Sequence, residues 1–275
     1  LPIAQATWRS LSMLWSWILK NIPKKLSNWD IPPSAVLAFS TWGAEQEDYF
    51  SFGFKDVVNE ESKELVASNR DRLNEWLQSA VEKENFLGLQ WLDQVHGVEC
   101  FEIKQDNFGA TLVGDAMWTN ETGLALAVLS ADCVPIVLAR EDSGSIGICH
   151  AGWKGLVQDV PGILAGEMTS CPSELSAWIG PSISQANYEI GPDVWKILEQ
   201  IAPEILRESP DSDKKRLADL SLLSEILLRR AGVRNIFQSR LCTYDNAEAF
   251  SYRRAAKNNS QESLGARMAT VVMRL

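Results

Sequence analysis

Short apolar runs, separated by turns rich in polar residues and glycine, dominate the hydrophobic pattern of the chain. Many of these runs alternate apolar with small or polar residues, or are short and continuously apolar, and both patterns are typical of buried strands. The pattern predicts strands at 35–40, 48–54, 87–92, 98–103, 124–129, 134–139, 146–150, 176–181, 236–237, 250–253 and 269–273. Residues 114–120 mix polar and apolar positions, so we expect a loop there.

Other segments repeat apolar residues at the spacing of a helix. Residues 60–82 predict a surface helix that buries Leu65, Leu73, Trp76, Leu77 and Val81. Two more helices are predicted at 192–201 and 217–231, with a charged surface connection at 203–215 between them. A further helix is expected around Pro161, which leaves its start open. Because strands and helices mix without regular alternation, the pattern favours an α+β fold over a doubly wound sheet.

The N-terminal segment differs from the rest of the chain in its hydrophobic pattern. Residues 6–20 predict an amphipathic helix, because apolar residues follow the helical spacing and basic residues flank them. Such a helix could lie on a membrane surface, but docking on the chain's own body or on a second subunit is the favoured interpretation. We therefore divide the chain into an N-terminal amphipathic extension at 1–34 and one main domain at 35–275.

Composition and charge narrow the class of protein. A chain of 275 residues can bury a sizeable core in one domain or two, and we favour one. The net charge of -10 argues against nucleic acid as the main partner, because a polyphosphate requires a positive field. No window is long and apolar enough to cross a bilayer. The five cysteines lack the spacing of a disulfide framework and follow no secretory signal, so we expect a cytoplasmic protein.

Three side chains that can bind a metal follow three of the strand-like runs. His96 lies in Gln94-Val-His-Gly97, Cys133 lies in Ala131-Asp-Cys-Val-Pro135, and His150 ends the run at 146–150. Imidazole nitrogen and thiolate sulfur are ligands of zinc, and a catalytic zinc site combines three protein ligands with an open fourth position. These three residues therefore predict a zinc site.

Two alternatives stay open, because the three residues lie far apart along the chain. Each could merely pack or form hydrogen bonds at a strand end, or Cys133 could act as a nucleophile with His150 as its base. Asp115 or Asp132 could orient the imidazole, and either could also cap a turn. A bound zinc would lower the pKa of its water from about 15.7 to about 7, which would support hydrolytic deamination.

Three basic residues could bind a phosphate group near these side chains. Arg253 and Arg254 could do so bidentately, and alternation along a strand at 250–253 would turn one of them inward. Lys154 follows the turn at His150 and could supply another cation. A local anion site is thus compatible with the negative net charge.

Several motifs together resemble the YfiH-type laccase-domain family. They are Gln94-Val-His-Gly97, Gly114-Asp-Ala-Met117, Ala131-Asp-Cys-Val-Pro-Ile136, His150-Ala-Gly-Trp-Lys-Gly155, Ile179-Gly-Pro-Ser-Ile183 with Tyr188-Glu189, and Phe250-Ser-Tyr-Arg-Arg254. Their order and spacing are similar to those of the family from about Phe39 to the C-terminus. The resemblance implies a single-domain mixed β-sheet sandwich flanked by helices, with zinc held by His96, Cys133 and His150.

The resemblance also implies an activity on purine nucleosides, with phosphate as the second substrate. It implies phosphorolysis of adenosine, inosine, guanosine and methylthioadenosine, and deamination of adenosine. We expect catalytic roles for Cys133, His150, His96 and Asp115. We expect Tyr188 to join Arg253, Arg254 and Lys154 in binding the substrate.

Older names in the family imply copper and the oxidation of polyphenols. A laccase-type copper cluster needs many imidazoles, whereas this chain has two histidines, although one copper ion could occupy the site. Copper-dependent polyphenol oxidation is therefore the alternative function, and a non-catalytic nucleoside-binding protein is another. The preferred nucleoside and the oligomeric state stay open.

This chain departs from the family at three places. Where the family has Thr-Arg and a Gly-Gly-Val-Ser loop, this chain has Thr41-Trp-Gly-Ala-Glu-Gln46. The family's Ser-Leu-Asn-Leu-Gly is replaced by Ser51-Phe-Gly-Phe-Lys55, and its Thr-Gly-Arg is replaced by Leu264-Gly-Ala-Arg267. The first two belong to the N-terminal wall of the expected site. They bear on substrate range and turnover.

Overall fold

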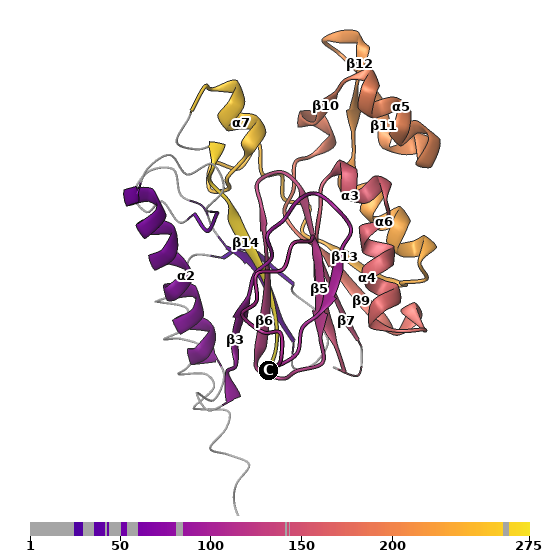
Figure 1. Ribbon diagram of the computed structural model, residues 1–275. Coiled ribbons are helices and arrows are strands. Elements are labelled where there is room, and N and C mark those ends of the chain that lie inside the picture. The colour runs from indigo at the N-terminus through magenta and orange to yellow at the C-terminus, as the bar shows by residue number, and fades with distance from the viewer. Residues whose placement is uncertain are drawn as a thin grey trace, which may run out of the picture.

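Two β-sheets lie face to face, and helices cover both outer sides, in the computed structural model of this chain (Figure 1). The structure describes residues 25–29, 36–41, 43, 51–53, 60–80, 85–140, 142, 144–260 and 264–275. The expected α+β class is confirmed. The helix predicted at 6–20 and most of the strand predicted at 48–54 lie outside the described residues.

The first sheet has five strands in the order β1-β2-β14-β6-β3. These strands are β1 (Lys25–Asn28), β2 (Val36–Thr41), β14 (Met268–Arg274), β6 (Leu124–Ser130) and β3 (Gly88–Gln90). β1 pairs antiparallel with β2, so that Lys25 lies opposite Thr41. Residues 25–28 of the expected N-terminal extension therefore join the sheet, while the division of the chain at residue 34 stays a prediction.

The second sheet has six strands in the order β13-β9-β7-β8-β5-β4. These strands are β13 (Asn235–Gln238), β9 (Leu175–Ile179), β7 (Val134–Arg140), β8 (Ile146–Ala151), β5 (Ala116–Thr119) and β4 (Cys100–Glu102). β5 corrects the expected loop at 114–120. Ala116 and Met117 point to opposite faces and both are fully buried, so this short strand shows no alternation of polar and apolar residues.

Helices cover the outer face of each sheet. The first sheet packs against α2 (Glu60–Ala80), which buries Val66, Leu73, Trp76 and Leu77, whereas Leu65 is 40% exposed, contrary to the expectation. The second sheet packs against α3 (Trp153–Val157), α4 (Val160–Met168) and α6 (Leu220–Arg230), whereas α5 (Pro192–Ile201) packs against the segments 206–209 and 212–218. Pro161 lies in the first turn of α4, where a missing backbone N–H costs little. A proline is not accommodated inside a helix, so α3 and α4 are separate helices.

The region between α5 and α6 corrects another expectation. Instead of a charged surface connection, residues 203–215 belong largely to a small sheet, β10 (Glu189–Ile190), β12 (Ser212–Ala218) and β11 (Leu206–Ser209). Most side chains of β12 are charged and at least partly exposed, so its strand character is hidden in the hydrophobic pattern. α6 begins at Leu220 rather than at 217, because the Asp219 side chain accepts a hydrogen bond from the Leu222 amide at 2.8 Å.

The strand predicted at 250–253 is wrong as well, since this segment begins a helix. The Ser251 hydroxyl accepts a hydrogen bond from the Arg254 amide at 3.1 Å and caps α7 (Tyr252–Lys257). Short 3-10 turns complete the described part: Pro172–Glu174, Gln185–Asn187 and Pro203–Ile205. Among the described helices, none combines the length and the apolar character that crossing a membrane requires.

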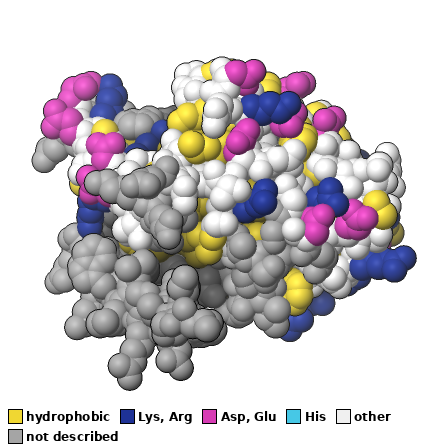
Figure 2. Space-filling view, turned by 90° about the horizontal axis from the view of Figure 1, so that it is seen from below, with side chains coloured by type: hydrophobic (Ala, Val, Ile, Leu, Met, Phe, Trp, Pro, Cys, Tyr) yellow, Lys and Arg dark blue, Asp and Glu magenta, His cyan; other side chains and the backbone are white. Residues whose placement is uncertain are grey.

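Two loops pass from the first sheet to the second, and this crossing positions the site. One joins β3 to β4 and the other joins β6 to β7. The β6–β7 loop lies at the end of the sandwich that carries α3 and α7, the upper end in Figure 1. Figure 2 shows the opposite end, where charged side chains are scattered, hydrophobic ones form small separate groups, and no described histidine is visible.

Candidate metal centre

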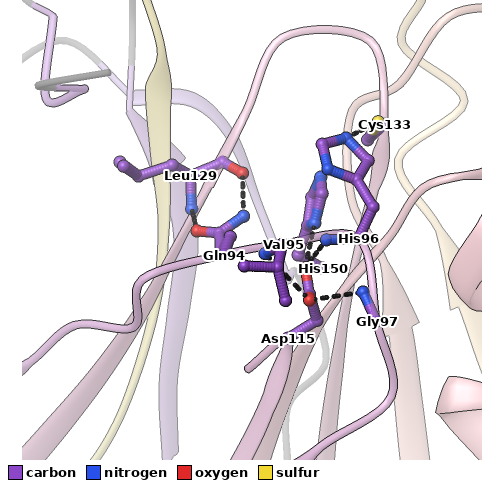
Figure 3. A network of polar contacts seen from close by, with 8 residues as sticks. All are labelled: Gln94, Val95, His96, Gly97, Asp115, Leu129, Cys133 and His150. Atoms are coloured by element: carbon purple, nitrogen blue, oxygen red, sulfur yellow. Dashed lines mark hydrogen bonds and ion pairs between the residues drawn. The ribbon is translucent and has the colours of Figure 1, made fainter. Parts of the chain in front are cut away.

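The three predicted ligands come together where these loops cross. His96 lies in the β3–β4 loop, Cys133 in the β6–β7 loop, and His150 near the end of β8 (Figure 3). Gln94 ties the β3–β4 loop to the end of β6: its side-chain amide donates to the Leu129 carbonyl at 2.8 Å and accepts from the Leu129 amide at 2.7 Å. The packing of the two sheets thus brings together three residues that lie far apart in the sequence.

The distances fit a single shared ion. One ligand atom from each of His96, Cys133 and His150 lies within 4.8 Å of the others, and Cys133 Sγ lies 3.9 Å from His96 Nε2. Zinc bonds of about 2.0 to 2.3 Å set tetrahedral ligand atoms about 3.3 to 3.6 Å apart. Small side-chain rotations would therefore bring the three atoms onto one ion.

Asp115 holds two of the ligands in place. Its carboxylate is fully buried and accepts a hydrogen bond from His150 Nδ1 at 2.8 Å. It also accepts the backbone amides of Val95, His96 and Gly97 at 3.1, 3.1 and 2.6 Å. Because Nδ1 donates to Asp115, the lone pair of His150 is left on Nε2, the atom that would bind a metal. The same contacts hold His96 at its positive φ of 61°.

The charges around Cys133 favour the thiolate, which is the form that binds a metal. Burial alone would raise the pKa of Cys133, but the charges and hydrogen bonds of His150 and His96 lower it to about 6. Burial alone would lower the pKa of His150, but Cys133 and then Asp115 raise it to about 9. For Asp115, the hydrogen bonds from His150, Gly97 and Val95 outweigh burial and lower the pKa.

Asp132 has different hydrogen-bond partners from Asp115. Its carboxylate accepts hydrogen bonds from the Thr243 hydroxyl and the Arg253 amide, both at 2.7 Å, and contacts neither imidazole by a hydrogen bond in the described structure. It therefore anchors the Cys133 loop to the start of α7, while Asp115 orients His150. Its φ of 94° marks a backbone held by these contacts.

A cavity of about 810 Å³ lies over the three ligands and is lined by all of them. Of the expected substrate-binding residues, Tyr188 and Arg253 also line it. The Arg253 guanidinium lies 5.1 Å from the centre of the Tyr188 ring and donates to the Glu189 carbonyl at 3.0 Å. Lys154 instead lines a second cavity of about 300 Å³, which shares His96, Cys133 and Tyr188 with the first.

Arg254 is not brought to either of these cavities. Its guanidinium donates to the backbone carbonyls of Thr243, Tyr244, Asn246 and Ala249. The expectation of strand alternation at this arginine pair fails because both residues lie in α7.

The large cavity is also lined by residues that were not predicted to bind the substrate, among them Arg70, Trp91, Tyr252 and Arg267. Arg70 lies on α2, whose exposed residues are mostly charged, so it looked like a surface residue. The apolar run at 87–92 was the one signal for Trp91. Arg267 ends the segment Leu264-Gly-Ala-Arg267, which replaces the family's Thr-Gly-Arg, and this resemblance was its one signal.

Replacing Gly152 with alanine is expected to weaken zinc binding by about tenfold or more, because a shift of ligand geometry costs affinity. A Cβ there would lie 2.9 Å from His96 Cδ2 and 3.1 Å from Cys133 Sγ. The backbone itself (φ -74°, ψ 169°) accepts alanine, so the effect would come from space alone. Zinc competition with a chromophoric chelator measures it.

Gly166→Ala in α4 is the matched control, since nothing lies within 4 Å of its added Cβ. It should keep zinc affinity and raise the free energy of unfolding by up to about 1 kcal/mol. Equal zinc affinity in both variants would contradict the placement of the ion beside Gly152.

The mixed β-sandwich and the His-Cys-His group at the crossing of two loops together indicate a candidate metal-binding domain. Residues 35–274 match the family model described as multi-copper polyphenol oxidoreductase laccase. The chain belongs to this laccase-domain family, of the YfiH type, as the motifs indicated.

Known relatives agree with this assignment. The chain is 32% identical over 256 residues to a protein of Xylella fastidiosa named purine nucleoside phosphorylase, covering 87% of this chain and 92% of the relative. It is 33% identical over 169 residues to purine nucleoside phosphorylase YfiH of Escherichia coli, covering 60% and 68%. The crystal structure of YlmD from Geobacillus stearothermophilus superposes with a TM-score of 0.74 at 26% identity, covering 91% of this chain and 99% of YlmD.

Proposed function

We propose that this protein is a zinc-dependent purine nucleoside phosphorylase that also deaminates adenosine and phosphorolyses methylthioadenosine. The observation that carries the proposal is the convergence of His96, Cys133 and His150 within 4.8 Å at the wall of a large cavity. The names of the relatives support the nucleoside and phosphate substrates. The five free cysteines support a reducing compartment such as the cytoplasm.

The donor set suits zinc, with two imidazoles and a thiolate leaving one position open. When bound, zinc supplies Lewis-acid chemistry at that position. Asp115 does not line the cavity, so its part in the proposal is to hold His150 and the His96 loop rather than to touch the substrate. The catalytic role expected of Asp115 is thus proposed to be that of a positioning residue.

Arg253 is proposed to bind the phosphate that attacks the ribose carbon as the purine leaves. Its guanidinium is fixed by the Glu189 carbonyl and by the Tyr188 ring, and both Arg253 and Tyr188 line the cavity. A guanidinium fixed in this way meets a phosphate dianion with little further loss of side-chain freedom. Tyr188 is proposed to contact the substrate through the ring face that Arg253 does not cover.

Product analysis tests the proposal. Inosine with phosphate should give hypoxanthine and ribose 1-phosphate, and adenosine without phosphate should give inosine. Arg253→Gln should raise the KM for phosphate by about tenfold or more, because a hydrogen bond to a charged group contributes about 1.5 to 3 kcal/mol. Arg229→Gln, which removes an exposed guanidinium paired with Glu225, is the control and should leave this KM unchanged.

Three results would contradict parts of the proposal. Absence of every product would favour a non-catalytic nucleoside-binding protein. Oxidation of a phenol by the copper-loaded protein, without any nucleoside product, would favour the polyphenol oxidase. Activity that survives complete zinc removal but not Cys133→Ala would favour Cys133 as a nucleophile.

A further inference from the structure

The large cavity extends from the metal ligands to a second cationic region. Arg70 of α2 and Arg267, which precedes β14, both line it, together with Gly53 and Trp91. Trp91 packs in the hydrophobic cluster under α2, whereas His150 comes from the second sheet. Arg70 therefore lines the cavity from the side of the first sheet, and the Arg267 guanidinium lies 5.9 Å from the centre of the Tyr252 ring.

Arg70 is held as a rigid cation. Its Nε and Nη2 atoms donate to the Phe52 carbonyl at 3.0 and 2.8 Å, and its guanidinium lies 4.3 Å from the centre of the Trp91 ring. The Trp91 ring in turn stacks on Phe52, with centroids 6.1 Å apart and planes 24° apart. Burial lowers the pKa of Arg70 to about 10, so the side chain is still protonated at neutral pH.

Arg267 is fixed against the same short segment. Its Nη1 atom donates to the carbonyls of Leu264 and Ala266 at 2.7 and 2.8 Å, and its backbone amide donates to the Ser51 hydroxyl at 3.1 Å. A Cβ at Gly53 would lie 2.7 Å from Arg267 Cγ, so the glycine makes room for the arginine stem. Segment 51–53 thus holds the Arg70 guanidinium at the Phe52 carbonyl and packs against the stem of Arg267 at Gly53.

We propose that Arg70 and Arg267 form a subsite for the 5′-phosphate of a purine nucleoside monophosphate. Two guanidinium groups, fixed by backbone carbonyls, match the oxygens of a phosphomonoester dianion.

The position of the subsite favours a phosphate that is attached to the nucleoside. Arg253 lies beside Tyr188, close to the ligands, and is the cation available to the attacking phosphate under the proposed function. Arg70 and Arg267 line the same cavity from α2 and from the segment before β14, so they would meet a second anionic group of one bound molecule. A volume of about 810 Å³ lies within the range of pockets that bind ligands larger than a nucleoside.

Binding measurements test this subsite without relying on turnover. Calorimetric titration of the zinc-loaded protein should show inosine 5′-monophosphate binding at least about tenfold more tightly than inosine. Arg267→Leu should reduce that ratio to about twofold or less, whereas Arg267→Lys should keep part of it. Arg229→Leu is the matched control and should leave the ratio unchanged, because Arg229 lies on the surface beside Glu225.

The outcomes separate this inference from the proposed function. A monophosphate preference in a protein that forms no nucleoside product would support the subsite and reject phosphorolysis. Phosphorolysis of inosine without a monophosphate preference would do the reverse. If inorganic phosphate binds and is lost in Arg267→Leu while the two inosine compounds bind equally, the pair binds free phosphate and the inference is overturned.

Discussion

Replacing Cys133 with alanine is expected to remove tightly bound zinc from the purified protein. The change deletes the thiolate and leaves two imidazoles whose Nε2 atoms alone would face the ion. Zinc affinity should fall by more than about 100-fold, because even the loss of a residue that hydrogen-bonds to a metal ligand typically lowers metal affinity by about 10- to 100-fold. Metal analysis of protein purified without chelators, followed by zinc competition, measures the loss.

Cys171→Ala is the control for this experiment, because Cys171 is an exposed free cysteine away from the site. It should bind zinc as the unaltered protein does. Equal zinc contents in the two variants would end the assignment of the centre. Alkylation gives a second measure: zinc should protect Cys133 from iodoacetamide and leave Cys171 reactive.

Replacing Asp115 with asparagine is expected to weaken both the fold and the centre. The carboxylate accepts three backbone amides and His150 Nδ1, and an asparagine side chain would turn an NH₂ group towards donors. The free energy of unfolding should fall by about 2 to 4 kcal/mol. Zinc affinity should fall by about 10- to 100-fold, as for other partners of metal-binding histidines. Urea unfolding and zinc competition report the two effects.

Asp106→Asn supplies the comparison, because Asp106 is an exposed aspartate in the turn after β4. Its free energy of unfolding should stay within about 0.5 kcal/mol of the unaltered protein. Should Asp115→Asn keep full zinc affinity, the carboxylate would not orient His150 in the way described here.

Much of the fold was predictable where burial leaves a clear pattern in the sequence. The strands β6, β7 and β14 appeared as apolar runs because the sandwich buries both of their faces. The start of α7 was mistaken for a strand because apolar and polar residues alternate there. The hydrogen bond that caps the helix at Ser251 outweighs this alternation. The strand β12 was missed because its charged side chains point to water in a hairpin that buries little.

The three metal ligands were predictable as a set, but their geometry was not. Residue types alone marked His96, Cys133 and His150 as ligands, and only the packing of the sheets brings them together. Asp115 and Asp132 each lie in polar turns and looked equivalent in sequence. Their partners distinguish them, since one faces His150 and the other faces Thr243. The same holds for Arg267, whose neighbour Gly53 is more than 200 residues away in the chain.

The pairing of β1 with β2 determines which backbone groups of the first sheet face solvent. Val36–Thr41 is hydrogen-bonded to β14 on one side and to Lys25–Asn28 on the other. A fragment starting at residue 35 would leave one side of β2 as an open ladder of amide and carbonyl groups, which is a template for intermolecular strand addition. Residues 25–28 therefore cover this side of β2, and the four-residue strand β1 becomes the edge of the sheet, which leaves a shorter open ladder than β2 would.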